Sequence, residues 1–203
     1  FPDALTYLPA LERPMFDALP QQGSLLFGMS DFDRSCGRVD REVRDGDVIE
    51  IELRPEYPPR NQYQEQAILT ILMNDHGIVQ AKTGFGKTYV AVNAITQIKR
   101  KTLILVHKSA LIDQWISEIV RYTTLTRDDI CTIGERNQDL SKPILITTVQ
   151  NLIAKMRLGN WELRDALIKA DVGLTFFDEC HVTAAEKFAM ASRWVFSKRV
   201  FGL

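Results

Sequence analysis

Apolar and polar positions follow two different periods along the chain after residue 60. Short apolar runs are typical of β-strands covered on both faces. Segments in which apolar residues recur three or four positions apart are typical of helices that pack one face on a core. The runs predict strands at 77–81, 102–107, 143–147, 172–177 and 199–203, and the spacing predicts helices at 62–74, 87–99, after 109, up to 156 and at 161–170.

Strands that alternate with helices in this order predict βαβ units, and therefore an α/β fold with a central parallel sheet flanked by helices. Ser109 is placed to cap the helix that follows it. In that helix we interpret Trp115 as a core residue rather than as a platform on which a base stacks. It belongs to a stripe of apolar residues at helical spacing, which are Leu111, Ile112, Trp115, Ile116 and Ile119.

Residues 1–60 do not share this regularity. Ile49–Leu53 alternates apolar and acidic residues, as a half-buried strand does, and residues 24–29 are its candidate partner. We expect residues 1–56 to form a small accessory segment or domain that is partly β. The alternative is a linker with one strand that docks on the main domain, and the pattern does not decide between the two. Residues 57–203 then form the second unit.

The charge distribution changes at the same place. Residues 1–60 contain 12 acidic and 7 basic side chains and no lysine, whereas residues 61–203 contain 14 acidic and 18 basic ones. A basic, nucleic-acid-binding face on the second unit is compatible with that shift. The 3 cysteines are widely spaced and form no disulfide framework, which favours an intracellular setting, cytoplasmic, nucleoid-associated or nuclear. No run approaches the ~18 apolar residues of a membrane span, so no membrane is expected as a partner.

A glycine-rich loop stands between the strand predicted at 77–81 and the helix predicted at 87–99. Its sequence, Ala81-Lys-Thr-Gly-Phe-Gly-Lys-Thr88, follows the phosphate-binding pattern GxxxxGK[ST] except that alanine replaces the first glycine. Glycines let backbone N–H groups turn towards phosphates at the positive end of the next helix. The Lys87 ammonium is expected to contact the β- and γ-phosphates of ATP, and the Thr88 hydroxyl is expected to ligate Mg²⁺. The bland alternative is a glycine turn before an ordinary helix.

Two adjacent carboxylates follow the strand predicted at 172–177. Asp178 and Glu179 would therefore lie at the carboxyl end of a strand, where α/β sheets place their sites. ATP hydrolysis needs a metal clamp and a positioned water, so we expect Asp178 to hold Mg²⁺ and Glu179 to orient and deprotonate the water. The alternative is an acidic pair that only stabilises the start of the following helix. The co-occurrence with the loop around Lys87 favours the catalytic reading.

Together these motifs resemble the superfamily 2 helicases. Residues 81–88 resemble motif I of that superfamily, including its alanine, and Asp178-Glu-Cys-His181 resembles a DExH-type motif II. The resemblance covers about residues 57–203 and implies a RecA-like P-loop domain, the first of two motor lobes. Arg199–Leu203 resembles the run that leads into motif III, so the chain is expected to be a piece that stops before motif III and the second lobe.

Weaker matches add further site residues. Tyr63–Ile68 resembles the adenine-recognition segment of the XPB/Rad25, UvsW-like and restriction-motor branches, which implies that Gln64 reads adenine; Asn61 departs from the arginine usual there. His181 is implied to couple the γ-phosphate site to motif III. The nucleotide contacts implied by the resemblance and the loop are Gln64, Thr83, Gly84, Phe85, Gly86, Lys87 and Thr88, and the nucleic-acid contacts implied by motifs Ia and Ib are Lys108, Gln114, Thr147 and Thr148.

The resemblance implies an ATP- and Mg²⁺-dependent motor lobe that acts on DNA, with RNA as an alternative. Hydrolysis would need arginines from the missing second lobe, so this chain alone should bind nucleotide weakly and turn it over very slowly. Two other readings stay open. One is a restriction-system motor that translocates along duplex DNA without separating strands, and the other is a nucleotide-dependent nucleic-acid-binding module without turnover.

Overall fold

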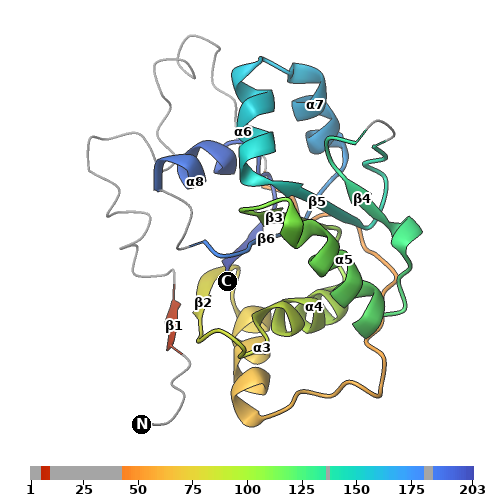
Figure 1. Ribbon diagram of the computed structural model, residues 1–203, viewed down its shortest axis with the longest axis vertical. Helices are drawn as coiled ribbons and strands as arrows, with labels where there is room; N and C mark the ends of the chain where they lie inside the picture. Colours follow the sequence, from red (N-terminus) through yellow and green to blue (C-terminus); the bar gives the residue numbers. More distant parts are fainter. Residues whose placement is uncertain (1–5, 10–42, 136–137, 181–184) are drawn as a thin grey trace.

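The computed structural model describes residues 6–9, 43–135, 138–180 and 185–203, and Figure 1 shows a central sheet with helices on both sides. The strand order is β1-β2-β7-β6-β3-β5-β4. In this spatial order, each pair of neighbouring strands from β2 through β7, β6, β3 and β5 to β4 is parallel. β1 pairs with β2 in the antiparallel sense. The strands are β1 Thr6–Pro9, β2 His76–Gln80, β3 Thr102–Val106, β4 Ile130–Thr132, β5 Ile144–Thr148, β6 Leu174–Phe177 and β7 Arg199–Gly202.

The helices divide between the two faces of the sheet. Helices α3, α4 and α5 contribute to one apolar core, and α6, α7 and α8 contribute to the other (Figure 1). Their bounds are α3 Gln62–Met73, α4 Lys87–Ile98, α5 Ala110–Tyr122, α6 Val149–Arg157, α7 Trp161–Lys169 and α8 Ala185–Ser192, with a short 3₁₀ turn, η2, at Arg127–Asp129. In the residues that the structure describes, no helix is both long and apolar enough to cross a membrane.

Alternate residues of each central strand face opposite cores, as the two-residue period of a strand requires. In β3, Ile104 and Val106 pack among α3, α4 and α5, while Leu103 and Leu105 pack on the other side. All five residues of β3 are buried. This two-sided burial is why the sequence shows continuous apolar runs instead of alternation.

The predicted α/β fold with a flanked parallel sheet is confirmed, and the elements predicted after residue 60 are present within a residue or two of their expected ends. Two details differ. The three-residue edge strand β4 was not predicted, because its apolar residues are too few to give a period. Ser109 occupies the position before α5, but its side chain makes no capping hydrogen bond because its backbone is already helical.

Residues 43–57 form a segment that we call the N-terminal strap. It runs along the main domain, with isolated bridges from Arg44 to Ser197 and from Val48 to Arg100. Ile49 and Ile51 are buried in the core of α3, α4 and α5, whereas the glutamates between and after them are exposed. The expected alternation at 49–53 is therefore real, but the segment pairs only through isolated bridges. The candidate partner at 24–29 lies outside the described residues.

The strap approaches the start of β6 without side chains at the point of contact. Gly46 has a φ of 79°, and a Cβ built on it would lie 2.1 Å from the nitrogen of Gly173. A Cβ on Gly173 would lie 1.9 Å from the carbonyl oxygen of Asp45. Two facing glycines therefore allow the two backbones to meet directly.

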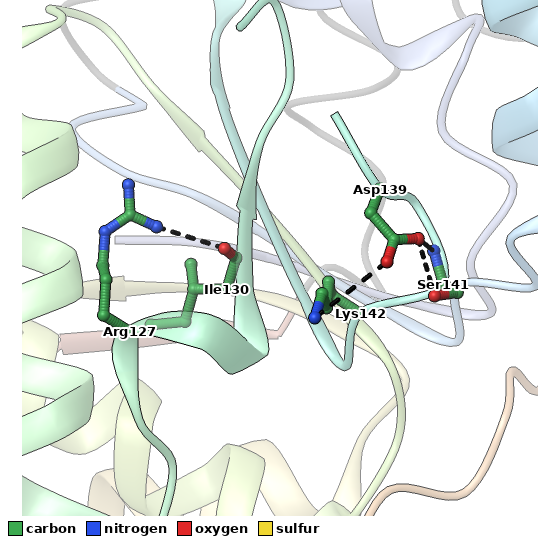
Figure 2. Close-up of polar contacts among 5 residues, drawn as sticks. All are labelled: Arg127, Ile130, Asp139, Ser141 and Lys142. Carbon is green, nitrogen blue, oxygen red and sulfur yellow. Dashed lines mark hydrogen bonds and ion pairs between the residues drawn. The ribbon is translucent and has the colours of Figure 1, made fainter. Parts of the chain in front are cut away.

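Polar contacts fix the chain on both sides of β4 (Figure 2). Before the strand, the Arg127 guanidinium donates to the carbonyl oxygen of Ile130 over 3.1 Å. After it, the Asp139 carboxylate accepts from the backbone N–H and the hydroxyl of Ser141, at 2.9 and 2.6 Å, and pairs with Lys142. These Ser141 bonds hold the pKa of Asp139 below its ordinary value. The contacts shape the turn that leads into β5.

Candidate nucleotide site

The glycine-rich loop joins β2 to α4, as predicted, and two of its glycines adopt backbone conformations that other residues avoid. Gly84 and Gly86 have φ values of 85° and 88°. A Cβ on Gly84 would meet open space, so its conformation alone requires glycine there. α4 begins at Lys87 directly after the loop, and the free N–H groups of its first turn point back towards it. This arrangement can bind an anion.

Gln64 supports the loop from α3. Its side-chain amide donates to the carbonyl oxygen of Phe85 over 2.7 Å and accepts from the backbone N–H of Arg60 over 2.8 Å. A Cβ on Gly86 would lie 2.7 Å from the nitrogen of that amide. Gln64 is only 1% exposed, so both ends of its amide are engaged within the protein. Its predicted role towards adenine would require it to exchange these partners.

The two predicted carboxylates lie at the carboxyl end of β6, beside the end of β3. The backbone N–H of Asp178 donates to the carbonyl oxygen of Leu105 over 2.9 Å. Glu179 has a φ of 51°, a left-handed conformation that is strained for a residue with a side chain. The chain therefore turns sharply at Glu179, directly after Asp178.

The loop and the carboxylate pair face each other across the site. The Lys87 ammonium lies 3.8 Å from a carboxylate oxygen of Glu179, although the two residues are 92 positions apart in the sequence. Both side chains are partly enclosed, with 16% and 35% of their surface exposed. Thr88 is half-buried in the first turn of α4, next to Lys87, while Thr83 in the loop is exposed and Phe85 is half-buried. The arrangement can place a phosphate-binding cation and two acidic groups around one small volume.

Asp178 is the more deeply enclosed carboxylate. It is 8% exposed, and one of its oxygens accepts a 2.8 Å hydrogen bond from the indole N–H of Trp115. Burial raises the pKa of Asp178 above its ordinary value, the Trp115 bond and the Lys87 charge oppose this, and the Glu179 charge adds to the rise. Trp115 is 1% exposed, a core residue as predicted, but its polar contact was not foreseen. A buried indole needs an acceptor, which is the signal that the sequence offered.

The predicted nucleic-acid contacts have different settings. Lys108, after β3, and Gln114, on α5, are exposed. Thr147 is 1% exposed, and its hydroxyl donates to the carbonyl oxygen of Ile133. The half-buried Thr148 accepts the backbone N–H of Asn151 and so caps α6. The structure thus leaves the first two side chains exposed and engages the hydroxyls of the two threonines within the protein. His181 lies outside the described residues.

An aromatic pocket that the sequence did not reveal adjoins the first turn of α4. Its volume is about 290 Å³. Tyr122 packs edge-on against the rings of Tyr57 and Tyr89, with centroid distances of 5.1 Å for both pairs. The Arg121 guanidinium lies over the rings of Tyr57 and Tyr122. The pocket is lined by Glu56, Tyr57, Pro58, Pro59, Arg60, Tyr89, Arg121 and Tyr122.

The flanked parallel sheet, with its glycine-rich loop after β2 and its acidic pair after β6, defines the class of this protein as an α/β domain with the RecA-like fold. Comparison with known families agrees with this class. Residues 58–202 match the family described as "Type III restriction enzyme, res subunit". The match covers more than half of the chain, and the chain belongs to this family.

Two of the relatives are described as DNA helicases. The chain is 31% identical over 159 residues to the "DNA 3'-5' helicase XPB" of Mycobacterium tuberculosis, a match that covers 78% of the chain and 28% of the relative. It is 35% identical over 145 residues to the "Putative DNA 3'-5' helicase Rad25" of Haloarcula marismortui, covering 71% of the chain and 22% of the relative. The chain thus spans about a quarter of the length of these relatives.

Among solved structures, the UvsW helicase of bacteriophage T4 has the same fold. The superposition gives a TM-score of 0.59 with 20% sequence identity, and it covers 86% of this chain and 60% of that one. A helicase domain of Hef from Pyrococcus furiosus gives a TM-score of 0.56, also at 20% identity, over 74% of this chain and 34% of that one. At this identity the likeness supports the fold alone.

Proposed function

We propose that this chain is the ATP-binding first lobe of a motor that moves on DNA or separates its strands. The observation that carries the proposal is the approach of Lys87 and Glu179 to within 3.8 Å between the glycine loop and the end of β6. The names of the helicase relatives support DNA as the partner, with RNA as the alternative.

The residues present fit ATP and Mg²⁺. The two positive-φ glycines open a cradle of backbone amides for the phosphates, and Lys87 supplies the cation beside it. Thr88 and Asp178 offer the hydroxyl and carboxylate oxygens that Mg²⁺ prefers. When bound, Mg²⁺ would neutralise charge on the phosphates. Glu179 would orient and deprotonate the attacking water, and its carboxylate already lies 3.8 Å from the Lys87 ammonium of the loop.

The adenine is proposed to lie near the aromatic pocket. Arg60 lines that pocket and binds Gln64 through its backbone N–H, so the pocket and the glycine loop are joined through Gln64. Tyrosine rings and the Arg121 guanidinium suit a flat, electron-rich ring. Gly84, Thr83 and Phe85 would line the phosphate side.

The nucleic acid is proposed to bind at the carboxyl ends of β3 and β5. Lys108 and Gln114 are exposed there and can contact a phosphate backbone. Thr147 and Thr148 would contribute through the loop that they stabilise, because their hydroxyls are engaged within the protein. A second RecA-like lobe, from the rest of a longer protein, would close over the nucleotide and supply arginines. His181 is proposed to couple nucleotide state to motif III.

A pair of variants tests this function. The isolated chain should bind a fluorescent ADP analogue only with Mg²⁺, and Lys87→Ala should abolish the binding. In the full-length protein, DNA should stimulate ATP hydrolysis, and Glu179→Gln should slow hydrolysis by about 10²- to 10⁴-fold while binding persists. The effect is large because the variant loses the group that deprotonates the water. A full-length protein that binds nucleotide but shows no ATP hydrolysis, with or without DNA, would instead favour a binding module.

Translocation along duplex DNA without strand separation is a second candidate, favoured by the family description. The two candidates differ in one product. A translocase displaces a third strand from a triplex but leaves a tailed duplex intact, whereas a helicase separates the tailed duplex.

A further inference from the structure

Trp115 makes a contact that the proposed function does not use. Its indole N–H donates to one oxygen of Asp178 over 2.8 Å, and both residues are at least nine-tenths buried. Hydrogen bonds from buried donors to carboxylates are among the stronger ones in proteins. An Asp178 side chain held in this way cannot rotate without breaking a bond that water does not replace.

The two residues meet because of the sheet order. β6 pairs with β3, and α5 follows β3 and packs on the same face as α4. Phe176 faces that side of the sheet, so Asp178, two residues later, points to it as well. Trp115 reaches Asp178 from the middle of α5, on the face opposite the exposed side chains of that helix.

We propose that Trp115 is the positioning residue for the magnesium-binding carboxylate. It occupies one oxygen of Asp178 and so leaves the other oxygen to bind the metal. This inference rests on the proposed ATP site, since it concerns how that site is held before the nucleotide arrives.

The same bond gives the DNA-facing helix a direct connection to the nucleotide site. Gln114, one of the proposed DNA contacts, precedes Trp115 in α5 and is exposed. A small rotation of α5 on binding DNA would move the indole, and with it the carboxylate. The contact therefore offers a route from the DNA surface to the metal-binding group within this lobe.

The test compares two tryptophans that are both buried, Trp115 and Trp194. Trp115→Phe removes the N–H, while Trp194→Phe makes the same change at a residue that is 4% exposed in the opposite core. Binding of the fluorescent ADP analogue is measured against Mg²⁺ concentration. Trp115→Phe should raise the Mg²⁺ concentration at half-saturation by about tenfold, the loss expected for a buried bond to a charged group. Trp194→Phe should leave it within twofold of the parent.

A spectroscopic readout separates positioning from a general loss of stability. In a Trp161→Phe/Trp194→Phe background Trp115 is the sole tryptophan, because the chain contains 3. Its emission should change when Mg²⁺·ADP is added and should not change in the same background with Asp178→Ala. The inference is wrong if Trp115→Phe and Trp194→Phe raise the Mg²⁺ concentration at half-saturation equally. It is also wrong if Mg²⁺·ADP binds and the emission of Trp115 does not change. Absence of Mg²⁺-dependent binding in the parent chain would instead contradict the proposed function.

Discussion

At the scale of single residues, the site depends on groups whose type could be predicted but whose contacts could not. The loop pattern and the carboxylate pair indicated Lys87, Thr88, Asp178 and Glu179, because each motif consists of residues that are adjacent in the sequence. The Trp115 contact joins residues 63 positions apart and depends on the strand order, which no local pattern gives. The same holds for Gln64, whose partner Phe85 lies in another element.

A prediction about Gln64 follows from these contacts. Because its amide supports the carbonyl oxygen of Phe85, Gln64→Ala should weaken binding of ADP and GDP analogues by a similar factor, about tenfold. Glu65→Ala, an exposed neighbour on the same helix, is the control and should change neither affinity. The measurement is a pair of fluorescence titrations with Mg²⁺ present. A loss confined to the adenine nucleotide would show that the amide reads the base and is not mainly a support.

At the scale of elements, the long strands and helices were predictable and the edge of the sheet was not. β3 and α5 carry enough apolar residues to define a period, whereas β4 has only three residues. Polar contacts lie on both sides of β4 (Figure 2). η2 leads into β4, and there the Asp129 carboxylate accepts from the backbone N–H and the hydroxyl of Thr126, at 2.8 and 2.7 Å. Local hydrogen bonds thus add to the burial of Ile130 and Cys131 at this edge.

Asp129 therefore gives a pH-dependent contribution to stability. The bonds from Thr126 hold the pKa of Asp129 below its ordinary value. The contribution of Asp129 to the free energy of unfolding is complete above the pKa of this carboxyl in the unfolded chain, about 4. It is lost as the pH falls through the lower pKa of the folded state. Asp129→Asn should lower the free energy of unfolding by about 0.5–1 kcal/mol at pH 7.

Urea denaturation at several pH values from 7 downwards measures this effect. The difference between Asp129→Asn and the parent should narrow as the pH falls below ~4, where the carboxylate of the unfolded chain is protonated, and should be lost below the lower folded pKa. Asp128→Asn removes an exposed carboxylate from the adjacent position and serves as the control. A difference that persists unchanged into acid would mean that the charge is not what stabilises the turn.

At the scale of the whole molecule, the N-terminal strap belongs to the packing of the lobe. The sequence left open whether residues 1–56 form a separate domain or include a segment that docks, because alternation alone does not say what a strand packs against. In the structure, Ile49 and Ile51 lie in the same core as Ile68 of α3 and Val90 of α4. The division near residue 57 stays a prediction, and residues 43–56 contact the main domain.

Truncation of one strap side chain should therefore affect the entire lobe. Ile51 is 1% exposed, so Ile51→Ala should lower the free energy of unfolding by about 2–4 kcal/mol, through lost burial and the cavity that remains. Val48→Ala, at a residue that is 71% exposed, should change it by less than about 0.5 kcal/mol. Both are read from chemical denaturation at one pH. Equal, small effects would show that the strap is dispensable for stability.

The facing glycines at 46 and 173 set a condition on any rearrangement of this protein. A Cβ at either position would overlap the opposite backbone. Replacing one glycine or both by a residue with a side chain would therefore separate the strap from β6. A chimera that replaces the N-terminal segment with one from a related protein would need a glycine in the same register opposite Gly173. Without it, the incoming segment would have to follow a different path across the lobe, and the two isoleucine sites beneath it would stand empty.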